Sequence, residues 1–288
     1  MHFSNDLLES PTKFALQKLL ILRMKRLSLI LLGCAFTLIF CNATGCKSKN
    51  EVPQNTAVAP TPPTPPAAPE TPAPTATTSD VMPDLAKVKI KTKYGDMTVA
   101  LYNETPLHRD NFLKLAEEKY YDGLLFHRCM RSFMIQGGDP GSRGAAMSQM
   151  LGTGGPGYTV PSEFRPNLIH KKGALAAARQ PDEVNPKKAS SGSQFYIVQG
   201  QMWNDMQLSQ NEISASQSLP GFKYTEDQKQ IYKTLGGTSQ LDMNYTVFGE
   251  VIAGLAIVDS IAAQPVARGN RPLQDVIMNM EVIQKSHK

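Results

Sequence analysis

Residues 126–139, with the sequence FHRCMRSFMIQGGD, bring together side chains that could bind and polarise a peptide. Two short β-prone runs, at 124–130 and 133–136, end at a pair of glycines, which indicates a hairpin. Arg128 offers a permanently charged group with several donors, and Gln136 offers an amide. Phe133 and Met134 add apolar surface beside them. This combination is unusual for a protein core and predicts a peptide-binding surface.

Strand geometry divides this stretch between two faces. Because alternate side chains of a strand point in opposite directions, we expect Phe126, Arg128 and Met130 on one face and His127 and Cys129 on the other. Cys129 is the only cysteine beyond residue 46, and no C-x-x-C motif occurs. It is therefore predicted to be a small buried apolar residue, with no zinc site or disulfide framework. The pattern alone also fits an edge hairpin whose Arg128 keeps its charged end in water.

Four stretches in the same order resemble the cyclophilin-type peptidyl-prolyl cis/trans isomerases. The first is the 126–139 stretch, and the others are GALAAAR at 173–179, GSQFYI at 192–197 and LDMNYTVFGEV at 241–251. Together they indicate a family domain over roughly residues 87–284. One such match is weak, whereas four collinear matches are specific.

The resemblance implies roles for residues of all four stretches. Arg128, Gln136 and Phe133 match the family's catalytic positions, and the reaction requires no metal or cofactor. Met134, Tyr196 and Leu241, with Phe133, are implied to line an apolar pocket for proline. The complete set of implied substrate-binding residues is Met134, Ala178, Arg179, Gln194, Tyr196, Leu241, Tyr245 and His127. For Ala178 and Arg179 we expect backbone contacts, and for His127 the alternative is a structural hydrogen bond within the barrel.

Three of the implied site residues depart from the family pattern, as do Met243, where the family usually has Gly, and Gln240, where it has Trp. Arg179 stands where the family usually has Asn, Tyr196 stands for Phe, and Tyr245 stands for the His of well-known members. The Tyr196 exchange is expected to be a modest change, and Tyr245 can still pack on proline. Because Arg128 and Gln136 are both retained, the resemblance implies activity.

The remaining pattern predicts a mainly β fold. We expect a hairpin at 88–102, strands at 173–178, 194–199, 245–251 and 276–283, and helices at 105–119 and 254–262. Many strands with few helices indicate a closed antiparallel barrel, and the resemblance specifies eight strands with a helix over each end. In the first helix, Phe112, Leu115, Ala116 and Tyr120 should be buried, and His108 should be a solvated surface residue.

Two segments interrupt this pattern. Residues 137–161 form a glycine-rich stretch without regular structure, and its G-x-G-x-x-G at 152–157 lacks the strand and helix of a dinucleotide site. Residues 200–240 form an insertion with a Gln/Ser-rich start. Within it, the capping-box pattern at Thr225 predicts a helix to about Leu235.

The N-terminal part of the sequence resembles a targeting segment for export and lipidation. Residues 1–23 show no pattern and are expected to be an upstream extension, with Met24 as the start. Residues 24–45 have the charged and apolar regions of a secretory signal. They end in Ala-Thr-Gly before Cys46, which resembles a lipobox, so Cys46 is the expected lipidation site. Cys34 is the rival site, and a plain signal peptide or an uncleaved anchor is the alternative.

Residues 46–80 then form a Pro/Thr/Ala-rich linker, because nine of the 21 prolines fall between 47 and 80 and such a composition cannot bury a core. The predicted isomerase domain covers 81–288. Residues 1–45 supply +3 of the net charge of +5, which leaves about +2 for residues 46–288. So small a surplus does not indicate nucleic-acid binding. We therefore expect a monomeric, membrane-anchored lipoprotein outside the cytoplasm, facing the periplasm, that acts on proline-containing polypeptides.

The function remains open between three interpretations. The favoured one is a prolyl isomerase that assists the folding of exported proteins. The alternative is a cyclophilin-like module or chaperone that binds proline peptides with little catalysis. An unrelated barrel that binds a small ligand would make the four matching stretches accidental.

Overall fold

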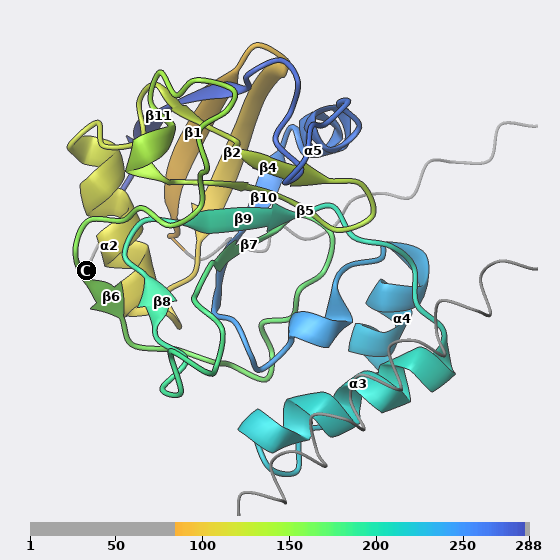
Figure 1. The fold of residues 1–288 in the computed structure, drawn as a ribbon. Helices are drawn as coiled ribbons and strands as arrows, with labels where there is room; N and C mark the ends of the chain where they lie inside the picture. Colours follow the sequence, from red (N-terminus) through yellow and green to blue (C-terminus); the bar gives the residue numbers. More distant parts are fainter. Residues whose placement is uncertain (1–83, 286–288) are drawn as a thin grey trace, which may run out of the picture. The chain divides into compact units, whose positions relative to one another are not determined.

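The computed structural model describes residues 84–285, and the expected signal, lipidation site and linker lie outside them. A strongly curled antiparallel sheet dominates this part of the chain (Figure 1). Its strands are β1 (Ala86–Thr92), β2 (Gly95–Leu101), β3 (Leu124–Leu125), β4 (Arg128–Met130), β5 (Met134–Gly137), β7 (Ala174–Ala177), β9 (Phe195–Val198), β10 (Val247–Ala253) and β11 (Ile277–Gln284). They follow the order β3-β11-β1-β2-β10-β7-β9-β5-β4.

Smaller elements surround this sheet. The strands β6 (Thr159–Val160) and β8 (Ser190–Ser191) form a separate pair. The α-helices of the described chain are α2 (Pro106–Glu117), α3 (Asp205–Ser218), α4 (Glu226–Thr234) and α5 (Leu255–Ala262), and the short 3-10 turns are η1 (Pro140–Ser142) and η2 (Ser239–Leu241).

The predicted mainly β, antiparallel architecture is confirmed, but the strand count differs from the expected barrel. The curled sheet has nine strands, and its two end strands, β3 and β4, do not pair with each other. A closed ring of eight strands is therefore not seen among the described residues. The two end strands come from one segment, which pairs first with β11 and then with β5.

The interruption between β3 and β4 also corrects one expected orientation. Phe126 lies in the same buried core as Cys129, whereas Arg128 and Met130 are only partly buried. Phe126 therefore does not share a face with Arg128, because Phe126 and His127 belong to neither strand and the alternation starts again at Arg128. Cys129 is buried and free, as the sequence predicts.

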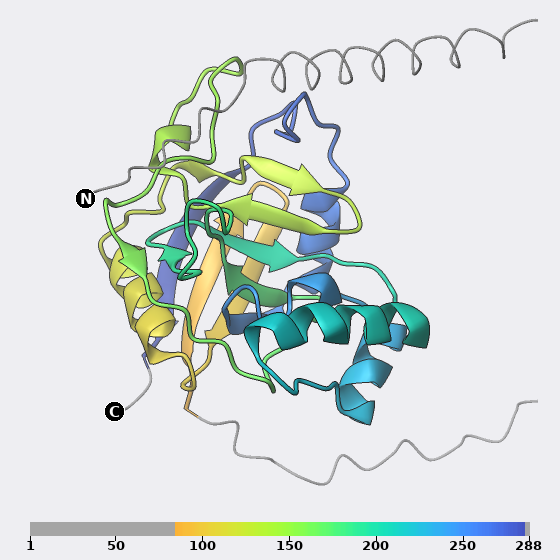
Figure 2. The same ribbon diagram turned by 60° about the horizontal axis from the view of Figure 1, so that its bottom comes forward.

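The interior of the curled sheet is an aromatic and aliphatic core. Phe112 of α2 packs against Phe195 and Phe248, with ring centroids 5.4 and 5.5 Å apart. Helices α2 and α5 lie at opposite sides of the sheet and both contribute to this core (Figures 1 and 2). The predicted buried stripe on α2 is confirmed for Phe112, Leu115 and Ala116. Tyr120 was also expected to be buried, but the neighbouring Tyr121 is buried instead.

The 200–240 insertion folds as two helices outside the curled sheet, as both views show (Figure 2). The predicted helix is confirmed as α4, where Thr225 and Gln228 form the expected capping box. Helix α3 was not predicted, although Asn204 and Gln207 form a second capping box at its start. The helices share a small core, whose buried members are Ile169, Leu208, Ala215, Phe222, Tyr224, Tyr232 and Met243.

Replacement of Gly138 by alanine should destabilise the fold. Gly138 has φ +88°, and an added Cβ would lie 2.2 Å from the carbonyl oxygen of Ser193. We expect the free energy of unfolding to fall by about 2–3 kcal/mol in urea titrations. Gly144→Ala is the matched control, because Gly144 has φ +63° with no atom near an added Cβ. Equal losses in both variants would contradict the overlap with Ser193.

Candidate functional site

A chain of hydrogen bonds crosses the predicted catalytic stretch. Arg128 on β4 stands opposite Gln136 on β5, and its Nη1 donates to Gln136 Oε1 at 3.1 Å. Gln136 Nε2 donates to Gln194 Oε1 at 3.0 Å, and Gln194 Nε2 donates to the carbonyl oxygen of Gly154 at 2.7 Å. This order fixes each amide and leaves the second N–H of Gln136 free for a ligand. The sheet register thus brings together three residues predicted for the site.

The glycine-rich stretch is folded around Asp139. Its carboxylate accepts hydrogen bonds from the backbone N–H groups of Gly141 at 2.7 Å and Gly152 at 2.5 Å. A Cβ at Gly154 would lie 2.2 Å from the same carboxylate, so only glycine permits this approach. Asp139 therefore holds the loop that presents the Gly154 carbonyl to Gln194.

Arg128 also borders an apolar cluster on the outside of the sheet. Its guanidinium carbon lies 5.8 Å from the centroid of the Phe133 ring, within cation–π range. Burial lowers the pKa of the Arg128 guanidinium, which nevertheless stays charged at neutral pH. Six predicted residues belong to this cluster, which we call the apolar site cluster: Phe133, Met134, Ala178, Tyr196, Leu241 and Tyr245.

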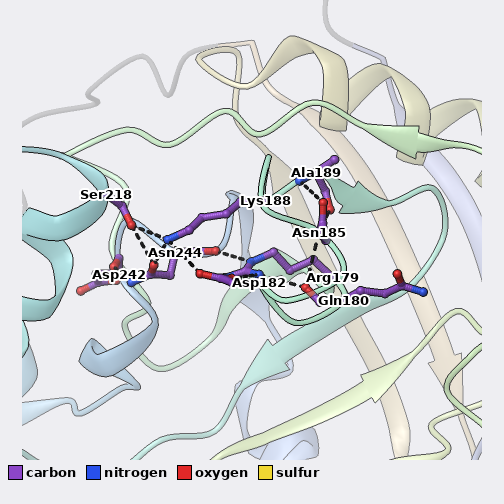
Figure 3. A network of polar contacts seen from close by, with 9 residues as sticks. All are labelled: Arg179, Gln180, Asp182, Asn185, Lys188, Ala189, Ser218, Asp242 and Asn244. Carbon is purple, nitrogen blue, oxygen red and sulfur yellow. Dashed lines mark hydrogen bonds and ion pairs between the residues drawn. The ribbon is translucent and has the colours of Figure 1, made fainter. Parts of the chain in front are cut away.

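The side chain of Arg179 forms one wall of the apolar site cluster, whereas the sequence predicts only a backbone contact from this residue. The guanidinium of Arg179 lies 4.5 Å from the centroid of the Tyr245 ring, and its Nε donates to the Asn244 carbonyl at 2.7 Å. Asp182 pairs with the same guanidinium at 2.5 Å (Figure 3). Arg179 thus fixes the Tyr245 ring, and aromatic stacking of this kind favours Arg over the family's usual Asn.

The same polar network reaches the insertion. Lys188 Nζ donates to Ser218 Oγ at 2.6 Å and to Asn244 Oδ1 at 2.5 Å (Figure 3). Ser218 is the last residue of α3, and its hydroxyl also donates to Asn244 Oδ1 at 2.8 Å. The loop after β7 and the turn that carries Tyr245 are therefore both bonded to α3.

The backbone of Ala178 differs from the expectation. Its N–H already donates to the Gln194 carbonyl, and its carbonyl accepts from Ser191. A peptide hydrogen bond from this N–H is therefore not available, because the Gln194 carbonyl already accepts it.

A groove of about 870 Å³ adjoins the hydrogen-bonded chain. Gln136 and Gln194 line it together with residues of the glycine-rich loop and of the loop after β7. Several lining residues could not be predicted from the sequence, because both loops lack periodic signals. These residues are Thr153, Tyr158, Thr159, Pro181, Val184 and Asn185. Exposed Tyr158 and Val184 give the groove apolar edges.

His127 is buried under the glycine-rich loop rather than exposed in the cleft. Its side chain is 4% exposed, and a Cβ at Gly152 would lie 3.5 Å from its Nε2. Burial lowers its pKa. Neither ring nitrogen makes a hydrogen bond of ordinary geometry within residues 84–285, although the Leu125 backbone interacts with the ring and opposes this lowering of the pKa.

A second constellation involves His108, which is buried rather than solvated as expected. Its Nδ1 lies 2.6 Å from Glu163 Oε2, and its Nε2 lies 2.9 Å from Ser190 Oγ. These are the spacings of a nucleophile, base and carboxylate. However, Ser190 is 2% exposed, and Glu163 also accepts the N–H groups of Leu107 and His108 at the start of α2. The constellation therefore anchors that helix.

Cys129 should be unreactive in the folded protein. Burial raises the pKa of its thiol to about 12, so almost no thiolate is present at pH 8. We expect iodoacetamide to leave Cys129 unmodified at pH 8 in native protein and to alkylate it in urea, as measured by peptide mass spectrometry. Rapid native alkylation of Cys129 would contradict its burial.

The described residues contain neither a metal-ligand cluster nor a membrane-spanning helix. Between residues 84 and 285, no three His, Cys, Asp or Glu side chains gather as metal ligands would. None of the helices in that range is long and apolar enough to cross a membrane.

Comparison with known proteins gives consistent matches. The family model described as cyclophilin type peptidyl-prolyl cis-trans isomerase/CLD matches residues 87–282. A Staphylococcus aureus (strain USA300) protein named as a peptidyl-prolyl cis-trans isomerase is 36% identical over 193 residues, covering 67% of this chain and 88% of that protein. A Streptococcus pyogenes serotype M6 protein, named as a bifunctional phosphatase/peptidyl-prolyl cis-trans isomerase, is 35% identical over 196 residues. The match covers 67% of this chain but only 37% of that relative.

Solved structures support the same fold. A Cryptosporidium parvum cyclophilin type peptidyl-prolyl cis-trans isomerase has a TM-score of 0.51 and 24% identity, covering 70% of this chain and 99% of that one. A structure of that protein in the presence of the dipeptide Ala-Pro has a TM-score of 0.50 and 24% identity, covering 69% and 99%.

Proposed function

Because the chain belongs to the cyclophilin-type peptidyl-prolyl cis-trans isomerase family, we propose that this site accelerates rotation about X-Pro peptide bonds. The observation that carries the proposal is the Arg128–Gln136 pair, which stands beside the apolar site cluster. A charged donor and an amide next to an apolar cluster match the two parts of an X-Pro unit, its peptide bond and its ring.

The chemical task is to lower the barrier of an amide rotation. Amide resonance gives an uncatalysed barrier of about 18–20 kcal/mol, and the isomerisation takes roughly tens to hundreds of seconds. As the bond twists, the proline nitrogen becomes pyramidal and gains a lone pair. A group that binds this lone pair is used only in the transition state, where binding raises the rate.

Arg128 is placed to supply that group. Its hydrogen bond to Gln136 and its contact with the Phe133 ring hold the guanidinium, and its other N–H groups remain available to a ligand. Gln136 would donate its second N–H to the substrate carbonyl that precedes proline. The held carbonyl fixes one side of the bond while the other side rotates, and the apolar site cluster keeps water away from the proline ring. Partial burial of Arg128 strengthens its donation.

The first test is catalysis by the protein itself. We expect the full chain to accelerate cis-to-trans conversion of a short Ala-Pro peptide well above the buffer rate, as followed by a coupled protease assay or by exchange NMR. If the protein binds the peptide but the rate equals that of buffer, the site is a binding module and the catalytic role of Arg128 is wrong.

The proposal extends to location and clients. The chain would act as a monomer outside the cytoplasm on exported proteins, held at the membrane by a lipid on Cys46 and spaced from it by residues 47–80. The signal-like segment 24–45 and the lipobox-like Ala-Thr-Gly-Cys support this extension. Mass spectrometry of the mature N-terminus should find a diacylated Cys46. Lipid on Cys34, or an unmodified N-terminus, would overturn the extension without affecting the isomerase proposal.

A further inference from the structure

A buried carboxylate lies between the apolar site cluster and the insertion. Asp242 is 1% exposed, and its Oδ1 accepts from the backbone N–H of His170 at 2.8 Å and from His170 Nδ1 at 2.7 Å. Its Oδ2 accepts from the hydroxyls of Tyr224 at 2.7 Å and Tyr232 at 2.5 Å. A carboxylate has about four acceptor positions, so these donors satisfy it completely.

His170 transmits this arrangement to the site. Because a carboxylate accepts hydrogen bonds, His170 Nδ1 carries a proton and donates it to the hydrogen bond with Asp242 Oδ1. The opposite ring nitrogen, Nε2, lies 2.9 Å from the hydroxyl of Tyr196. The two rings are stacked, with centroids 6.0 Å apart and planes 12° apart. Since His170 is bound to Asp242 through both its backbone and its ring, any movement of the carboxylate must move the partner of Tyr196.

Tyr196 forms part of the apolar site cluster itself. Its ring meets the Tyr245 ring edge-on at 6.0 Å, and it stands opposite Gln136 in the pairing of β5 with β9. The family's usual Phe at this position has no hydroxyl, so the bond to His170 depends on the tyrosine of this chain.

Both donors on Asp242 Oδ2 come from the insertion. Tyr232 is on α4 and is fully buried, and Tyr224 precedes the same helix and is 4% exposed. Their rings meet edge-on, with centroids 5.5 Å apart, within the core that α3 and α4 share. Burial beside Asp242 raises the pKa of both phenols, so both remain protonated donors. Without them the buried Oδ2 would have no donor, and the carboxylate would have to move or admit water.

We propose that Tyr224 and Tyr232 are positioning residues of the isomerase, which fix the Tyr196 ring in the proline pocket through Asp242 and His170. The inference rests on the proposed function. It gives the 200–240 insertion an indirect part in substrate binding, because Tyr196 is held from outside the curled sheet.

The test compares a Tyr224→Phe/Tyr232→Phe double variant with Ser216→Ala in the full chain. Ser216 belongs to the same insertion, and its hydroxyl donates to the Phe222 carbonyl rather than to Asp242. We expect the double variant to lower kcat/KM for an Ala-Pro peptide about tenfold, mainly through a higher KM, because the pocket contacts proline in ground and transition states alike. The control should match the parent.

NMR supplies a readout that a merely structural role would not move. With labelled histidine and tyrosine, the His170 ring nitrogens and the Tyr196 ring should shift in the double variant and stay unchanged in Ser216→Ala. A folded double variant with the parent's KM, kcat and Tyr196 signals would overturn the inference. If the double variant does not fold, the two single Tyr→Phe variants are tested, and each should raise KM in part.

Failure of the proposed function is recognised separately. A parent that does not accelerate isomerisation would overturn catalysis, and the same variants would then be judged by the affinity for the Ala-Pro peptide. An unchanged affinity in the double variant would overturn the positioning role as well.

Discussion

Replacement of Arg128 by alanine should lower kcat/KM for X-Pro isomerisation by about 10²–10³-fold, the loss typical of removing one preorganised donor to developing charge. The effect should be mainly on kcat, because the lone pair on the proline nitrogen exists only as the bond twists. The kcat/KM of Arg128→Lys should lie between those of the parent and of Arg128→Ala, since lysine keeps the charge but loses the planar donor geometry. Progress curves over a range of peptide concentrations measure both constants.

The chain offers a control three residues away. Arg131 lies at the exposed end of the same hairpin, so Arg131→Ala removes an equal charge without touching the site. Its rate should match the parent. Arg128→Ala should remain folded, because the half-buried side chain has Gln136 as its only side-chain hydrogen-bond partner among the described residues. Equal rates for the parent and Arg128→Ala would show that rotation is accelerated by confinement in the apolar site cluster alone.

Local signals predicted much of this architecture. The hairpin that pairs Arg128 with Gln136 follows from two β-prone runs that end at the Gly-Gly pair, and helix α4 follows from its capping box; the turn between β4 and β5 is formed by residues 131–133. Six residues implied by the resemblance meet in one cluster, although they come from four separate stretches. Their spacing in the sequence reveals no contact, so this juxtaposition depended on the resemblance.

The missed features share a physical cause. Helix α3 buries only three side chains, one of them the charged Glu212, so its sequence has little apolar period. His108 was expected in solvent because its partner, Glu163, lies 55 residues away in the sequence. The glycine-rich loop has no periodic signal, and its shape depends on one carboxylate, Asp139. Polar groups that satisfy each other across the fold leave no local trace in the sequence.

The Tyr196 exchange illustrates the same limit at the site. From sequence it differs from the family's Phe by one hydroxyl, which is a small change for an apolar pocket. In the structure that hydroxyl is the end of a buried chain through His170 and Asp242. The significance of the exchange is therefore visible only where residues 170, 196 and 242 meet.

The buried carboxylate should also be a large contributor to stability. Asp242→Ala removes the acceptor of two His170 donors and two tyrosine hydroxyls, all in a site without solvent access. Because unpaired buried donors keep their full desolvation penalty, we expect the free energy of unfolding to fall by about 3–5 kcal/mol in urea titrations. Asp242→Asn should lose less, since it keeps the volume and one acceptor oxygen.

Asp205→Ala is the matched control in the same insertion. Asp205 pairs with Lys233 at 2.8 Å, but its side chain is 70% exposed, and exposed pairs contribute about 0–1 kcal/mol. If Asp242→Ala cost no more than Asp205→Ala, the four donors would find new partners on removal of the carboxylate, and Asp242 could not hold Tyr196. A large loss confined to Asp242 would instead show that the four buried donors find no other acceptor, as the positioning of Tyr196 through Asp242 requires.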